Sequence, residues 1–307
     1  MSGPYVLVPA SITDAMVSSS TIAEPAAGEL LWDSATSYAI GAEVILTSTH
    51  RVYTAVVAGI DAVSPDVSPR WTDTRPTQKW AAFDAYITTQ SSAVTSMTYV
   101  LRPGIFNAIA AYGLEGATLA ISIKDAPGGA LVYSKDFALI DPPLDYYDYY
   151  FGRIRPLPKV LAKDLMPYAD PEVTLTVTAG AGVTVKAGMF VIGDLRSIVS
   201  IESNGGTQYD AQVKPTTTSL FVSDGFGGIK IVRRTKSTDI DISVLMPQSD
   251  ADAALAALQD VLDVPAAWIG SDAPGYSGLN AFGLADGSVK YPGPCRASMN
   301  ISVKGLF

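Results

Sequence analysis

Four aromatic residues in one short stretch place the strongest constraint on how this chain of 307 residues folds. They are Trp32, Tyr38, Tyr53 and Trp71, and glycine, valine, alanine and proline residues are interleaved with them. So short a segment cannot bury four rings in an ordinary core of its own. The spacing therefore predicts a small, aromatic-stapled β module over residues 32–76.

The order of residues in this stretch resembles the carbohydrate-binding module of chitinases and cellulases (families 5 and 12), which also occurs on bacteriophage tail proteins. The resemblance is carried by Trp32, Tyr38, Gly41, Val44, Tyr53, Ala55, Pro65 and Trp71. It implies that Trp32 and Trp71 pack the core of the module. It also makes Tyr38 and Tyr53 candidates for stacking on a glycan, because aromatic rings bind the apolar faces of sugars.

The chain departs from chitin-binding members just after Tyr53. Where those members carry adjacent aromatic residues, this sequence has Val56 and Val57, which do not stack on sugars in the same way. The departure favours a structural or docking role for the module over glycan binding.

Composition favours a turn-rich, mainly β protein and sets aside several functions. Charged residues make up 17% of the chain, and there are 26 glycines and 20 prolines. The net charge of -9 argues against nucleic acid as a partner. A single cysteine, Cys295, and a single histidine, His50, in an expected solvated turn, argue against a metal centre, a cofactor or a catalytic set. No apolar stretch is long enough for insertion into a membrane.

Residues 1–31 contain several prolines and a run of serine and threonine, so we expect an extended N-terminal arm that docks on a neighbouring subunit. A polar segment over residues 73–80 is the expected linker, with a domain boundary near Thr77.

Residues 77–200 show repeated alternation of apolar and polar residues, which predicts a β-sandwich. One hairpin is expected over residues 118–133, with a turn at 126–129, and a second over residues 173–185, with a turn at 180–182.

Residues 201–307 are expected to form a C-terminal β domain with one packed helix. A hairpin with its turn at Asp224–Gly228 comes first, followed by a strand in which apolar residues alternate with Asp239 and Asp241. The helix is expected at about residues 250–262, with Ser249 or Asp250 as its cap. Its apolar stripe consists of Ala251, Leu255, Leu258 and Leu262, and the last strand of Met299, Ile301 and Val303 alternates in the same way.

An aromatic run bracketed by prolines suits a long crossover between sheets. Its rings are expected at a contact between subunits, because tyrosine and phenylalanine are enriched in interfaces. A glycosidase-like carboxylate pair among Asp141, Asp145 and Asp148 is an alternative, but no spacing singles out two of them. The run consists of Tyr146, Tyr147, Tyr149, Tyr150 and Phe151.

From Trp80 onward the order of strand, turn and helix patterns is similar to that in a family of tail proteins from tailed bacteriophages. The resemblance is carried by residues 79–92, 145–151 and 189–193, and by the hairpin, strand and helix that begin at Asp224. It implies a non-enzymatic virion component of the distal tail or baseplate, assembled in the host cytoplasm as a homo-oligomeric ring and in contact with neighbouring tail proteins. A role in viral attachment is also implied. The alternative is a receptor-recognition protein that binds host polysaccharide through exposed aromatic rings.

Overall fold

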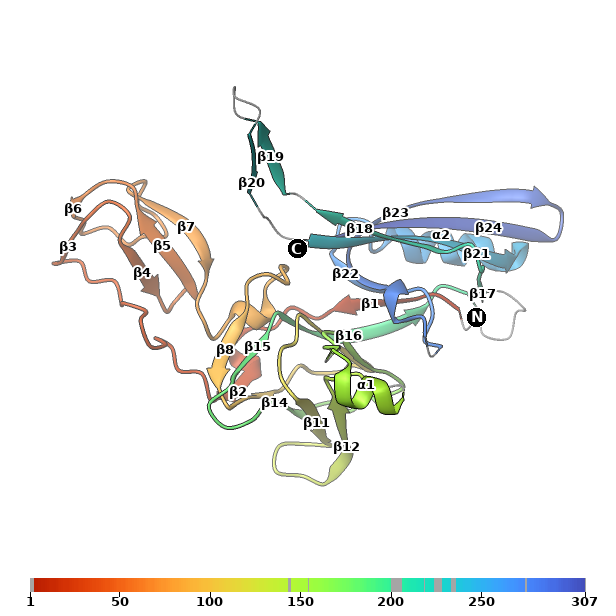
Figure 1. Ribbon diagram of the computed structural model, residues 1–307, viewed down its shortest axis with the longest axis horizontal. Coiled ribbons are helices and arrows are strands. Elements are labelled where there is room, and N and C mark those ends of the chain that lie inside the picture. Colours follow the sequence, from red (N-terminus) through yellow and green to blue (C-terminus); the bar gives the residue numbers. More distant parts are fainter. Residues whose placement is uncertain are drawn as a thin grey trace.

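The computed structural model describes residues 3–142, 145–153, 155–199, 206–217, 219–223, 228–232, 236–273 and 275–306. Across these residues the chain is mainly β, as the alternating sequence predicts (Figure 1). Short 3₁₀ helices complete the loops at η1 (Asp14–Met16), η2 (Ala81–Phe83) and η3 (Ser277–Leu279).

One long, curled antiparallel sheet forms the backbone of the structure. Its described strands run in the order β13, β10, β16, β1, β22, β23, β24, β21 and β17, and β18 also pairs with β21. Their bounds are β1 (Tyr5–Pro9), β10 (Ala108–Tyr112), β13 (Val160–Ala162), β16 (Met189–Ser197), β17 (Gly206–Thr207), β18 (Gln212–Thr217), β21 (Lys236–Pro247), β22 (Ala266–Ile269), β23 (Asn280–Gly293) and β24 (Arg296–Gly305).

A second sheet packs on β13, β10 and β16 to form the expected β-sandwich. It has the order β12, β11, β14, β9 and β2. Alternate residues of both sheets, such as Ile109, Phe190, Tyr99 and Leu175, meet in one buried core. The strand bounds are β2 (Val17–Ser20), β9 (Ser96–Leu101), β11 (Thr118–Lys124), β12 (Leu131–Ala138) and β14 (Glu172–Thr178).

The hairpin predicted over residues 118–133 is confirmed as β11 and β12, with Ile121 opposite Lys135. The second predicted hairpin is wrong. Strand β14 already pairs on both sides, with β11 and with β9. The chain beyond its turn, β15 (Thr184–Ala187), therefore crosses to pair with β8 (Ser91–Val94).

The N-terminal segment differs from the expected arm, because β1 lies inside the long sheet. It pairs with β16 on one side and with β22 on the other. Val6 and Leu7 are fully buried and point into different cores on the two faces of the sheet. The regions expected as two domains, 77–200 and 201–307, are thus joined through β1 into one continuous sheet.

The C-terminal region carries the predicted helix as α2 (Gln248–Gln259), which packs on β21, β23 and β24. The helix begins slightly earlier than expected, and Pro247 is its cap residue without a side-chain capping bond. Its buried face consists of Ala251, Ala254 and Leu258, so Ala254 takes the place expected for Leu255. The alternation in β21 and β24 is confirmed, with Ile240, Ile242, Val244, Met299, Ile301 and Val303 buried.

The predicted hairpin after residue 218 is confirmed as β19 (Leu220–Ser223) and β20 (Ile229–Val232), which project away from the body (Figure 1). Most of its expected turn, residues 224–227, lies outside the described residues. Asp241, on the outward face of β21, accepts a hydrogen bond from Ser302, and Asp239 accepts one from the amide of Gly305.

Candidate functional site

The aromatic module has its own small core and lies at one end of the structure (Figure 1). It is a β module, as the aromatic spacing predicts, and its strands form two sheets, β4–β5–β7 and β3–β6. Their bounds are β3 (Ser37–Tyr38), β4 (Glu43–Leu46), β5 (Arg51–Ala55), β6 (Gly59–Ile60) and β7 (Trp71–Pro76).

The structure places the rings of the module in its core rather than on its surface. Trp71 is buried, and Trp32 packs against the same cluster. Tyr53 is only 5% exposed, so its ring is not open for stacking on a glycan. Tyr38 is half-buried and meets Trp71 edge to face at 5.2 Å between ring centroids. The exposed side chains beyond Ala55 are Val56 and Val57, which are aliphatic.

Asp61 holds the module together, a role that sequence analysis missed. Its carboxylate accepts hydrogen bonds from the Ser68 hydroxyl at 2.5 Å, the Val63 amide at 3.0 Å and the Trp71 indole at 3.2 Å. The bond from Ser68 is the largest cause, and that from Val63 the next, of a pKa of Asp61 below its ordinary value. The bond from the indole fixes the orientation of Trp71.

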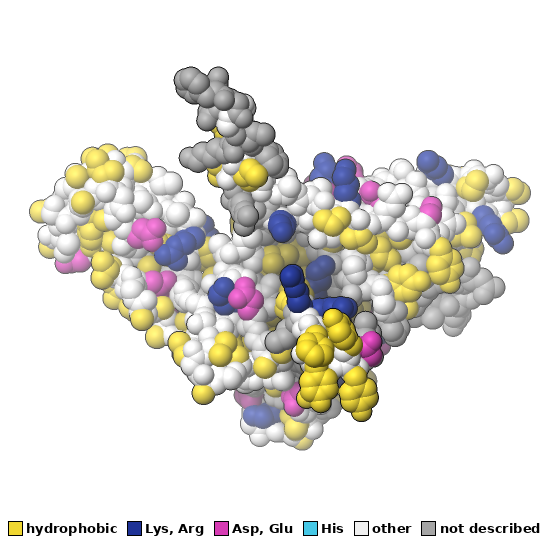
Figure 2. Space-filling model, viewed as in Figure 1, with side chains coloured by type: hydrophobic (Ala, Val, Ile, Leu, Met, Phe, Trp, Pro, Cys, Tyr) yellow, Lys and Arg dark blue, Asp and Glu magenta, His cyan; other side chains and the backbone are white. Residues whose placement is uncertain are grey.

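The aromatic run forms a short helix, α1 (Tyr146–Phe151), where a crossover loop was expected. Asp145 caps it, accepting a hydrogen bond from the amide of Asp148 at 2.7 Å. The aromatic rings lie between 69% and 85% exposed, and they stand out as a yellow group on the surface in Figure 2. They are Tyr146, Tyr147, Tyr149, Tyr150 and Phe151, which we call the α1 aromatic patch.

A cavity of about 140 Å³ lies beside the α1 aromatic patch. Tyr149 lines it together with two acids, Asp141 and Asp148, and two arginines, Arg153 and Arg155. The Arg155 guanidinium lies 3.8 Å from the carboxylate of Asp148. Ring, carboxylate and guanidinium therefore line one cavity, although sequence spacing did not single out any of these acids.

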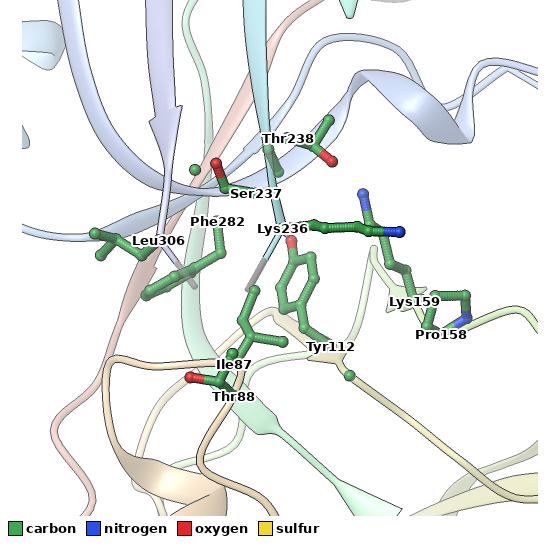
Figure 3. A pocket seen from close by; sticks show the side chains of 13 residues that line it. Ile87, Thr88, Tyr112, Pro158, Lys159, Lys236, Ser237, Thr238, Phe282 and Leu306 are labelled. Atoms are coloured by element: carbon green, nitrogen blue, oxygen red, sulfur yellow. The ribbon is translucent and has the colours of Figure 1, made fainter. Parts of the chain in front are cut away.

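A second cavity, of about 180 Å³, lies between the sandwich and the C-terminal region, and we call it the central cavity (Figure 3). Its lining combines apolar side chains from distant segments with two lysines. The apolar side chains include Ile87, Tyr112, Phe282 and Leu306, and the lysines are Lys159 and Lys236. Figure 3 shows both ammonium groups on the same side of the view, away from Phe282 and Leu306.

Two hydrogen bonds to Asn280 order one wall of the central cavity. The Tyr112 hydroxyl donates to Oδ1 of Asn280 at 2.6 Å, and the Lys159 ammonium donates to its backbone carbonyl at 2.5 Å. Burial lowers the pKa of Lys159 and raises that of Tyr112. Neither lysine was found from the sequence, because their common cavity depends on contacts between distant strands.

Comparisons with known proteins give no further assignment. No known protein family matches this sequence, and no curated protein matches it either. Within the described residues, no group of three or more acidic, histidine or cysteine side chains is arranged to hold a metal. None of the described helices combines the length and apolar character of a membrane span.

Proposed function

We propose that this protein is a non-enzymatic structural component of a bacteriophage tail, at the distal tail or baseplate, where it assembles with copies of itself and with neighbouring tail proteins. The observation that carries the proposal is the α1 aromatic patch. A group of rings exposed together is unusual on a protein that acts alone, and it is typical of a contact surface. The resemblance of residues 79–92, 145–151 and 189–193 to tail proteins supports the location.

The continuous sheet gives this role a mechanical basis. Because β1 pairs with strands from both halves, the sandwich and the C-terminal region are held as one body. A load on the sandwich would therefore be carried along the same sheet into the C-terminal region. The module, with its own core, provides a separate surface for contact with a neighbour.

Immunogold labelling of intact virions with an antibody against this chain tests the location. Label at the distal tail supports the proposal, and virions without label contradict it. Assembly is tested by measuring the mass of the purified chain by light scattering after replacing Tyr146, Tyr149 and Tyr150 with serine. The matched control replaces three other exposed tyrosines, Tyr86, Tyr209 and Tyr291. We expect only the first variant to lose oligomers.

A second function, attachment to a host polysaccharide, is favoured by the cavity beside Tyr149. Carboxylates and guanidinium groups hydrogen-bond sugar hydroxyls, and an exposed ring stacks on the sugar face. If the α1 aromatic patch serves attachment rather than assembly, replacement of Tyr149 by alanine abolishes binding on a glycan array and leaves the oligomer intact. The buried Tyr53 is the control position, since its replacement would affect folding instead.

A further inference from the structure

The two lysines of the central cavity have no carboxylate partner among the described residues. Acidic residues outnumber lysine and arginine by 30 to 21 in the sequence. Lys163, just beyond the other end of β13 from Lys159, forms an ion pair with Asp272. No described acid lies within ion-pair distance of the ammonium of Lys159 or Lys236.

This arrangement places two ammonium groups at one cavity with no carboxylate beside them among the described residues. Lys159 is partly buried, and an ammonium withdrawn from water is stabilised best by a negative charge. Its one hydrogen bond, to the carbonyl of Asn280, leaves two of its three N–H groups to serve another acceptor. Lys236 lines the same cavity, so an anion bound there would interact with two positive charges.

The rest of the lining sets the shape of the ligand. Ile87, Phe282 and Leu306 give the cavity an apolar floor, and its volume of about 180 Å³ is of the size of one large side chain. Pro158 and Lys236 are exposed, so the cavity opens to the surface. A ligand that matches both the two lysines and the apolar floor carries a carboxylate next to an apolar group.

We propose that the central cavity binds an acidic and apolar segment of a neighbouring protein, with its carboxylate held by Lys159 and Lys236 and an apolar side chain on the floor. The identity of this neighbour as a tail protein rests on the proposed function. Occupancy would also stabilise the chain, since the lining comes from both halves of the structure and a ligand bound only by the folded state favours folding.

The test is a titration of the full chain with N-acetylphenylalanine, which carries a carboxylate beside a ring. We expect a Kd on the order of 1 mM, as is usual for a ligand of this size, measured by ligand-detected NMR. N-acetylphenylalaninamide, without the charge, and acetate, without the ring, should each bind at least about tenfold weaker, a difference of about 1.4 kcal/mol.

Variants of the two lysines test whether N-acetylphenylalanine binds in the central cavity. Lys159→Gln and Lys236→Gln should each weaken N-acetylphenylalanine binding severalfold, with unchanged circular dichroism. Lys214→Gln makes the same charge change at an exposed position on β18 and should have no effect. Equal binding of the acid and its amide, or wild-type affinity in both cavity variants, would overturn the proposal.

The result of the N-acetylphenylalanine titration does not depend on the result of virion labelling. Label at the tail with no binding of the probe would refute the cavity proposal alone. Probe binding without label would refute the tail location and leave the cavity as a site for carboxylates.

Discussion

The carboxylate of Glu24 lies 3.0 Å from Nδ1 of His50, and this contact joins the N-terminal segment to the turn between β4 and β5. The same carboxylate accepts hydrogen bonds from Thr77 at 2.7 Å and from the Trp80 indole at 3.1 Å. His50 also stacks on Trp80, with 4.3 Å between ring centroids. His50 lies in a turn as expected, but its side chain is only 23% exposed, so the expectation that it is solvated is wrong.

Replacing Glu24 with alanine should weaken the attachment of the module. The indole of Trp80 and the hydroxyl of Thr77 would lose their acceptor, at a cost of about 1–3 kcal/mol for buried groups left unpaired. We expect a lower free energy of unfolding in urea and faster tryptic cleavage at Lys79. The control is Glu43→Ala, which removes an exposed ion pair with Arg75 and should change little. Equal effects of the two replacements would contradict this role of Glu24.

Leu7→Ala should destabilise the whole structure, because Leu7 is fully buried in a strand that joins both halves. The expected loss in the free energy of unfolding is about 2–5 kcal/mol, as for other large-to-small core replacements. Chemical denaturation measures it. Ile105→Ala removes an exposed aliphatic side chain and provides the control. If Leu7→Ala were as stable as this control, β1 would not be an integral strand.

Asp61 should make the module sensitive to acid. Its pKa is lowered in the folded state, chiefly by the hydrogen bond from Ser68. The resulting stabilisation is present above the ordinary pKa of 3.8 and is lost as the pH falls through the lowered value. An acid titration followed by tryptophan fluorescence should show a transition that Asp61→Asn removes. Asp66→Asn, at an exposed position in the same loop, should leave it unchanged.

Lys159 should make stability rise with pH in the alkaline range. Burial lowers its pKa below the ordinary 10.5, so the folded state holds fewer protons than the unfolded state between these two values. Stability therefore increases as the pH rises through that window. Urea unfolding at a series of pH values below 10.5 should show the increase in wild type and a smaller slope in Lys159→Met. The same slope in both proteins would contradict a buried ammonium at Lys159.

Local patterns in the sequence predicted much of the fold but not all strand partners. The alternation over residues 118–138 leads directly to a hairpin, because its two strands are neighbours in the chain and a short turn sets their register. The alternation over residues 173–185 is equally clear, yet β14 and β15 lie in different sheets. Which strands pair depends on the edges left free by distant segments.

Some residues of the candidate sites were likewise predicted from the sequence, and others were found only in the structure. The sequence indicated the aromatic run of α1 and the tryptophans of the module, since both are clusters along the chain. It did not indicate Glu24, Asp61, Lys159 or Lys236, because no local pattern in the sequence marks these charged residues. Their surroundings consist of groups from distant segments.

The sequence by itself determined the mainly β class, the small aromatic module and the amphipathic helix, because periodicity, turns and aromatic spacing are local properties. Only the tertiary structure decided that β1 joins both halves, that Tyr53 is buried, and that two lysines share a cavity lined by no acid among the described residues. Burial and electrostatic pairing depend on which distant surfaces come together, and these contacts exist only once the chain has folded.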